Sequence, residues 1–397
     1  MSTRSTLAFL KTETGSGLLL ALTALLAIAW ANSPWAGTYH LITHSAAPVQ
    51  VGPFFQEMTL AGWVKTALMP IFFFVVGLEI KYEVLRGELS NPRRLALPVL
   101  AAFGGVVAPA LVYLAFNLGP DGQPRGWPIA TATDIAFAIA ALAAAGRRLP
   151  PTLRTFLLTL AIADDVVAVA LIAILYTEEL RFPMLAGAAV VLAVMTALAR
   201  WRGAPYAAWA AAGVLLWGFT LESGINTSLA GIAAAFCVPL AARKSGGPGM
   251  LQEVMDALHP YVAFLILPLF AFTAAGFHIA GADIGPISLG VAVALFLGKQ
   301  AGVFGAAALA IGLKWARRPT GAKWIELYGV SALCGVGFTM SLYIGALAFP
   351  ETLPAAEAQV RAGVLAGSLA SVLLGLAVLR LSDARRAAEA EARAAPA

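Results

Sequence analysis

The 397-residue chain is 60% hydrophobic and only 12% charged, with a mean hydropathy of +0.83. Soluble domains contain about 45 to 50% apolar and about 25% charged residues, so this composition excludes a soluble protein and indicates a helical, polytopic membrane protein. The net charge of +5 does not indicate nucleic-acid binding, because the basic residues lie in short loops between apolar runs, where they orient membrane helices.

Apolar runs predict about twelve transmembrane helices, within one integral membrane domain that covers residues 1–397. Their ranges are 15–32, 59–80, 95–117, 126–145, 152–176, 182–199, 205–220, 224–240, 258–277, 285–312, 325–349 and 358–380. Alternate loops carry most of the Lys and Arg residues, and the opposite set holds only Arg125, Arg181 and Arg361. The positive-inside rule and the even number of spans predict that both termini are cytoplasmic, including a tail over 382–397.

The first loop, residues 33–58, is predicted to be periplasmic. Between His40 and Gln56 it is polar and bounded by proline, and Val49 and Val51 alternate with other residues. This alternation is compatible with a β-hairpin.

A polar break interrupts the span over 126–145. Thr131, Thr133 and Asp134 lie within one apolar segment, directly after Pro128. A similar break falls in the span over 325–349, where Gly335, Gly337, Thr339 and Ser341 lie together. Such clusters are typical of an unwound helix midpoint, although close helix packing explains a glycine-rich stretch about equally well.

The run over 160–176 carries two adjacent carboxylates, Asp164 and Asp165. A charge at that depth costs at least ~2.5 to 3.5 kcal/mol on insertion scales, so an intramembrane acid indicates a function. Neighbouring carboxylates cannot both ionise there unaided, so one of them stays protonated unless a cation neutralises the pair. The pair is therefore predicted to bind protons or a small hard cation in competition, with carboxylate oxygens as the ligands.

Lys299 lies in the middle of the span over 285–312 and needs a buried partner. The available anions are Asp164, Asp165 and Asp134. The spans over 95–176 and 285–380 each form a triplet with an interrupted middle member, and they start at opposite membrane faces. This pattern predicts two inverted repeats whose discontinuous helices cross near the bilayer midplane. Asp134 is then expected at two helix N-termini and Lys299 at two C-termini.

At these residues the sequence resembles the bacterial NhaA-type sodium/proton antiporters. The resemblance runs through most of the chain and is carried by the stretches FFFVVGLEIKYEVLRGELSNPRRLALPVLAAFGG, TATDIAFAIAAL, LAIADD, HPYVAFLILPLFAF and GVGFTMSLYIG. It implies electrogenic exchange of two protons inward for one Na+ or Li+ outward at the bacterial inner membrane, without a cofactor. It also implies a homodimer that pairs through the periplasmic hairpin.

The resemblance assigns roles to individual residues. It implies that Asp164 and Asp165 bind the ion, that Lys299 pairs with Asp164, and that Asp134 and Thr133 lie at the helix crossing. Candidates for a pH response are Glu79, Glu83, Glu253 and His259. The chain departs from the family pattern at several positions. Lys65 and Thr66 stand where the family commonly has an Asn-Asp pair, and Asn226 replaces a frequent histidine.

Three other classes of protein are considered. A retinal-type proton pump needs seven spans and an aromatic pocket around its lysine, whereas Lys299 is flanked by Gly298 and Ala301. An intramembrane aspartyl protease has one catalytic acid in a Gly-x-Gly-Asp context, which no aspartate here has. A channel favours rings of carbonyl oxygens from symmetric subunits.

Overall fold

The computed structural model describes residues 13–51, 54–87, 92–177, 180–201, 203–241, 249–279, 284–349 and 353–394. Contacts divide the chain into two compact units. Unit 1 comprises Met1–Ile28, Asn91–Ala168 and Ala275–Ala397, and unit 2 comprises Ala29–Ser90 and Val169–Ala274. Residues 52–53 of the predicted hairpin and 395–397 of the predicted tail lie outside the described residues.

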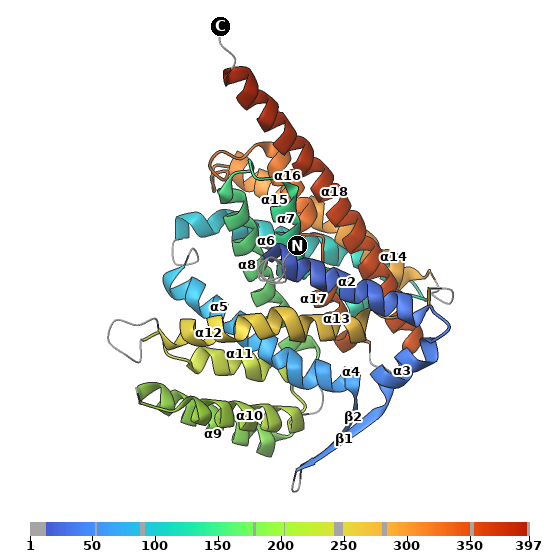
Figure 1. The fold of residues 1–397 in the computed structure, drawn as a ribbon, viewed down its shortest axis with the longest axis vertical. Coiled ribbons are helices and arrows are strands. Elements are labelled where there is room, and N and C mark those ends of the chain that lie inside the picture. Colours follow the sequence, from blue (N-terminus) through green and yellow to red (C-terminus); the bar gives the residue numbers. More distant parts are fainter. Residues whose placement is uncertain are drawn as a thin grey trace, which may run out of the picture. The chain divides into compact units, whose positions relative to one another are not determined.

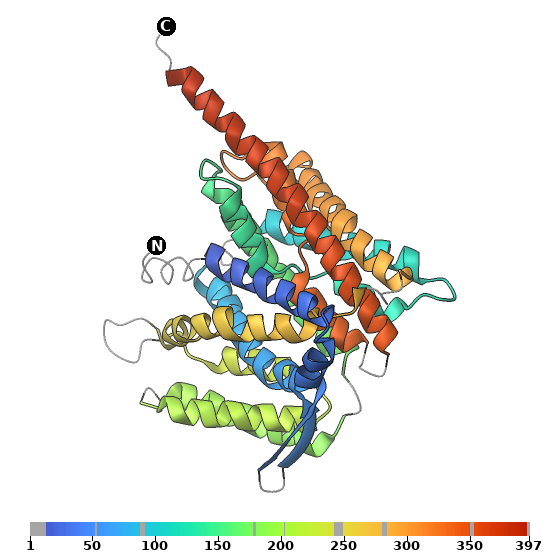
Figure 2. The same ribbon diagram turned by 45° about the vertical axis from the view of Figure 1, so that its right-hand side comes forward.

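Unit 1 is helical (Figure 1). Its elements are most of α2 (Glu13–Ala31), α6 (Pro92–Asn117), the 3-10 helix η3 (Pro124–Ala130), α7 (Ile135–Ala145), most of α8 (Pro151–Leu175), α14 (Pro286–Val293), the π-helical turn η6 (Ala294–Gly298), α15 (Lys299–Gly312), α16 (Trp324–Leu333), α17 (Phe338–Ala348) and α18 (Pro354–Ala394). Figure 2 shows the long α18 running beside α14 and α16, with which it is in contact.

Two helices of unit 1, α6 and α15, pack backbone against backbone. A Cβ atom added at Gly104 would lie 2.3 Å from the carbonyl oxygen of Gly302, and one added at Gly302 would lie 2.1 Å from that of Gly104. Small residues allow this close approach between membrane helices. The contact holds the helix that begins with Lys299 directly against α6.

Unit 2 contains the remaining helices and the only two strands among the described residues. Its elements are α3 (Ala36–His44), β1 (Ala46–Val51), β2 (Phe54–Thr59), α4 (Leu60–Trp63), η1 (Val64–Leu68), α5 (Met69–Arg86), α9 (Phe182–Arg200), α10 (Tyr206–Glu222), α11 (Ser228–Cys237), α12 (Met250–Tyr261), η4 (Val262–Ile266) and α13 (Leu267–Ala275). The strands form an antiparallel hairpin in which Val49 pairs with Gln56. The hairpin begins later than His40, because His40 and His44 lie on α3.

Seven of the described helices are long and apolar enough to cross a membrane. Three further helix pairs pass the same test together but are bent at a short break, which gives up to ten spans. The remaining predicted spans correspond to α10 and α11, which have 17 and 10 residues. The all-α membrane fold is therefore confirmed, whereas the total of twelve spans stays a prediction.

Candidate functional site

Two of the bent pairs in unit 1 are the predicted discontinuous helices. The first bends by 40° between η3 and α7, and the second by 41° between α16 and α17. Residues 131–134, with Thr131 and Thr133, and residues 334–337, with Gly335 and Gly337, separate the half-helices, whereas the predicted Thr339 and Ser341 lie on α17. Both breaks therefore fall where the sequence places them.

The two breaks bond to each other around Asp134, which is 2% exposed. The carboxylate of Asp134 accepts a hydrogen bond from the N–H of Phe137 at 3.0 Å, and so caps α7. It also accepts hydrogen bonds from the N–H and hydroxyl of Thr339, near the start of α17, while its own N–H donates to the carbonyl of Val336 at 2.7 Å. Asp134 thus lies at two helix N-termini, where the partial positive charge of the backbone favours an anion.

A residue that the sequence analysis missed, Ser368 on α18, supports the second break. Its hydroxyl oxygen lies 3.2 Å from the N–H groups of both Gly337 and Phe338 and accepts from them. These donors have no partner within α17, because the first N–H groups of a helix never do. A pair of serines, Ser368 and Ser371, within the apolar stretch 362–379 of this helix was the signal available in the sequence.

The central charged group of unit 1 is an ion pair. The ammonium nitrogen of Lys299 lies 2.6 Å from Oδ2 of Asp164, and both side chains are completely buried. The same ammonium donates to the carbonyl oxygen of Thr131 at 2.6 Å, at the end of η3. Of the three aspartates considered as partners, Lys299 therefore contacts Asp164.

Local structure positions Lys299 for this contact. The π-helical turn η6 directly precedes it, and the N–H of Lys299 bonds to the carbonyl of Ala294, five residues back. π-Helical turns often occur at functional sites. On the facing helix α6, a Cβ at Gly105 would lie 2.8 Å from Val303 and 3.5 Å from the Lys299 ammonium, so glycine leaves the space that the lysine occupies.

Thr133 connects the ion pair with the helix crossing. Its hydroxyl lies 2.8 Å from Oδ2 of Asp164 and 2.9 Å from the carbonyl oxygen of Cys334. A hydroxyl has one proton and two lone pairs, so it can donate to an ionised Asp164, or accept from a protonated one while it donates to Cys334. The hydroxyl can therefore bond to Asp164 in either protonation state.

The two carboxylates of α8 are equally buried, at 1% exposure each. Oδ1 of Asp164 is buried and has no hydrogen-bond partner among the described residues. A buried acceptor without a partner is costly, and a proton or a small cation bound to it removes that cost. The arrangement of Asp164, Lys299 and the neighbouring Asp165 is thus suited to hold protons or a small cation.

The candidate pH-responsive residues all belong to unit 2. Glu79 and Glu83 lie on α5, and Glu253 and His259 lie on α12. Glu253 accepts a hydrogen bond from the hydroxyl of Tyr206 at 2.6 Å, and His259 is exposed.

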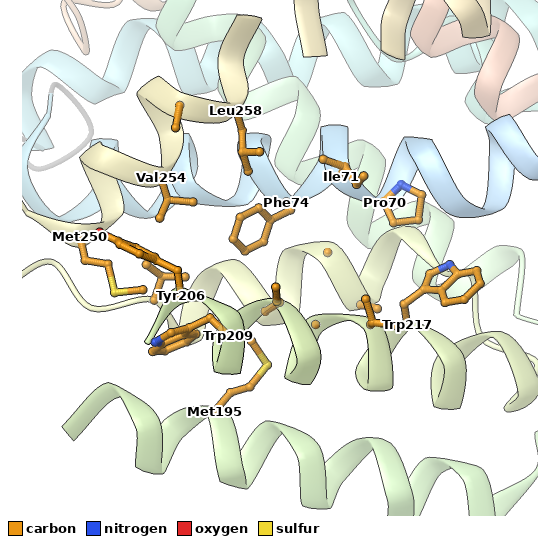
Figure 3. Close-up of a pocket in the computed structure, with 18 of the residues that line it drawn as sticks. Pro70, Ile71, Phe74, Met195, Tyr206, Trp209, Trp217, Met250, Val254 and Leu258 are labelled. Atoms are coloured by element: carbon orange, nitrogen blue, oxygen red, sulfur yellow. The ribbon is translucent and has the colours of Figure 1, made fainter. Parts of the chain in front are cut away.

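Unit 2 also contains a cavity of about 900 Å³, which is lined mainly by apolar side chains from α5, α9, α10, α11 and α12. Figure 3 shows Phe74, Met195, Trp209, Val254 and Leu258 around it. An apolar lining does not replace the water that surrounds a sodium ion or a proton, so this cavity is not the candidate ion site.

Comparisons with known proteins find one family along nearly the whole chain. A family model described as "Na+/H+ antiporter 1" matches residues 7–379. The chain is 46% identical over 389 residues to the Na(+)/H(+) antiporter NhaA 2 of Pseudomonas savastanoi pv. phaseolicola, a match that covers 96% of this chain and 97% of the relative. It is 48% identical over 379 residues to the Na(+)/H(+) antiporter NhaA of Rhizorhabdus wittichii, with 94% and 96% covered. The corresponding protein of Nitrobacter hamburgensis is 47% identical over 381 residues, with 95% and 91% covered.

Proposed function

This chain belongs to the Na+/H+ antiporter 1 family, and on that premise we propose that it is a secondary active transporter that exports Na+ or Li+ in exchange for protons. The proposed location is the bacterial inner membrane, with both termini in the cytoplasm. The family comprises transporters, so the intramembrane protease and the retinal-type pump are set aside.

The observation that carries this proposal is the buried pair of Asp164 and Lys299 beside a second buried carboxylate, Asp165. In the absence of a cation, the positive charge of the Lys299 ammonium compensates the negative charge of the Asp164 carboxylate. A sodium ion that reaches the unpartnered Oδ1 of Asp164 competes with this ammonium for the same carboxylate. Protons compete with the ion too, because a carboxyl group that is protonated loses the charge that holds the ion.

The proposed stoichiometry is two protons for each sodium ion. Such an exchange needs two groups that gain and lose a proton during the cycle. The site contains three candidates, namely Asp165 and the two members of the ion pair, Asp164 and Lys299. Because two positive charges enter for each one that leaves, the transport is electrogenic and no cofactor is needed.

Alternating access is proposed to involve the inverted repeats over 95–176 and 285–380. Asp134 and Thr133 support this proposal, because they fasten the two broken helices to each other with hydrogen bonds. Ion-coupled transporters hold their substrate at such breaks, where the half-helix ends carry partial charges that compensate buried ions. The β1–β2 hairpin is proposed to pair two copies of the chain at the periplasmic face.

Reconstitution in proteoliposomes tests the proposed function. With the purified chain in vesicles that are acidic inside, and with a fluorescent pH indicator, addition of Na+ or Li+ outside is expected to dissipate the proton gradient. K+ is expected to do so much less. Proton flux that is the same with and without Na+ and Li+ would contradict the proposal.

The pH profile of transport is expected to depend mainly on Asp164 and Asp165. Histidine changes charge near neutral pH, but the side chain of His259 is exposed, and water and salt screen the charge of an exposed side chain. The variant His259→Ala is therefore expected to shift the profile by less than about half a pH unit, with His278→Ala as the control. Loss of the alkaline activation in His259→Ala alone would mean that this histidine gates the site.

A further inference from the structure

The loop between α15 and α16 carries an excess of positive charge. Lys314, Arg317 and Arg318 are exposed, and the sequence has no Asp or Glu from Gly285 to Ile325. The next acidic residue along the sequence, Glu326, accepts hydrogen bonds on both carboxylate oxygens from Arg386. Among the described residues, no carboxylate therefore pairs with these three basic side chains.

The backbone at the start of this loop has an unusual conformation. The N–H groups of Trp315 and Ala316 both bond to the carbonyl of Ala310, which ends α15 in a tight turn around Lys314. Lys314 has a φ of 60° and is the only non-glycine residue with positive φ among the described residues. Glycine is the usual residue at this position, because a side chain destabilises the left-handed conformation. Lysine at this position therefore carries a backbone cost that glycine would not.

The rest of the loop is held in place by unit 1. Ala316 and Ala322 are buried in a core cluster of this unit. The hydroxyl of Thr152 on α8 donates to the carbonyl of Thr320 at 2.8 Å, and Arg386 on α18 donates to the carbonyl of Gly321 at 2.7 Å. The basic side chains therefore project from a preformed surface.

Apolar side chains lie beside the charges. Trp315 is 65% exposed and Trp324 is 42% exposed, and the guanidinium of Arg318 lies 5.3 Å from the centre of the Trp324 ring. Leu309 and Leu313, one helical turn apart, are also exposed at the end of the membrane-spanning segment Pro286–Gly312. Tryptophan is typical of the boundary between the apolar part of a membrane and water.

We propose that Lys314, Arg317 and Arg318 form a binding site for the head group of an anionic phospholipid. Arginine binds phosphate oxygens with two parallel hydrogen bonds, and basic residues directly after a spanning helix attract anionic lipid. Leu309 and Leu313 lie where an acyl chain would continue from this head group into the membrane. These apolar neighbours favour a lipid over a free phosphate ion.

Native mass spectrometry of the full chain in detergent tests the site by titration with phosphatidylglycerol. Each basic residue contributes a free energy equivalent to about a five-fold change in binding, so Arg317→Gln/Arg318→Gln is expected to weaken binding about thirty-fold. The matched control, Arg380→Gln/Arg385→Gln, removes the same charge from exposed positions of α18 and is expected to bind like the wild type. Phosphatidylcholine with the same acyl chains is expected to bind weakly to all of them.

A second variant separates the site from the stability of the loop. Lys314→Gly removes one charge and relieves the backbone strain at φ 60°, so it is expected to raise the melting temperature while it weakens phosphatidylglycerol binding about five-fold. Equal binding by both loop variants and the wild type would overturn the proposal. So would an equal loss in the α18 control, or competition by millimolar glycerol phosphate, which would indicate a site for free phosphate. None of these measurements depends on transport.

Discussion

Asp164→Asn and Asp165→Asn are each expected to abolish sodium-dependent proton flux in proteoliposomes. Asparagine keeps the size of the side chain but removes half of the carboxylate charge that offsets the dehydration of the cation. A buried charge that loses its partner costs about 3 to 5 kcal/mol, which corresponds to a loss of ion affinity of about a hundred-fold or more. Asp164→Asn also leaves the ammonium of Lys299 without its anion.

Asp383→Asn provides the matched control for both variants. Asp383 lies on α18 and accepts a hydrogen bond from the N–H of Arg148 at 2.7 Å, outside the ion site. Because this aspartate has no part in the proposed exchange, its variant is expected to keep most of the flux. Full sodium-dependent flux in Asp164→Asn or in Asp165→Asn would show that the pair is not the ion site.

Lys299→Ala is expected to lower the melting temperature of the protein in detergent. Both members of the ion pair are completely buried, and removal of one leaves the other uncompensated at a cost of about 3 to 5 kcal/mol. Lys299→Met keeps most of the side-chain volume. Its melting temperature is expected to fall nearly as far as that of Lys299→Ala, because the substitution mainly removes the charge. Thermal unfolding followed by the fluorescence of the protein measures both.

A double-mutant cycle tests whether the loss comes from the pair itself. In Lys299→Met/Asp164→Asn both charges are absent, so the loss of stability is expected to be smaller than the sum of the two single losses. Lys65→Ala, at a half-buried lysine of unit 2, is expected to change the melting temperature little. Additive losses for Lys299 and Asp164 would mean that their contact adds no free energy to folding.

The sequence predicted the charged residues of unit 1 and the two helix breaks because both carry a strong physical signal. A charge inside an apolar run is costly, so Asp134, Asp164 and Lys299 are conspicuous in the sequence. Thr and Gly clusters beside Asp134 and before Thr339 indicated where the helices unwind. The fold class followed from the apolar composition, whereas the antiporter family was predicted from a resemblance and the hairpin from a weak alternation around Val49 and Val51.

Contacts between distant segments could not be predicted from local patterns. Nothing in the order of residues indicates that Ser368 caps α17, that Thr131 offers its carbonyl to Lys299, or that the first half-helix is a 3-10 helix. These features arise because each freed backbone group takes its partner from another span. The π-helical turn before Lys299 has no proline within it, and its sequence, ALFLG, does not distinguish it from α-helix.

The hydrogen bonds around Asp134 have a consequence for how the protein responds to membrane voltage. A slip of one broken helix past the other by a single residue would be a shift of about 1.5 Å along the axis, enough to break the bonds to Val336 and Thr339 together. The two breaks are therefore fixed at one level relative to each other, so a charge held between them crosses a single fraction of the membrane voltage on the way to either surface. Since the full voltage contributes about 2.3 kcal/mol per elementary charge at 100 mV, the common level of the two breaks decides how strongly the potential drives each half of the proposed transport cycle.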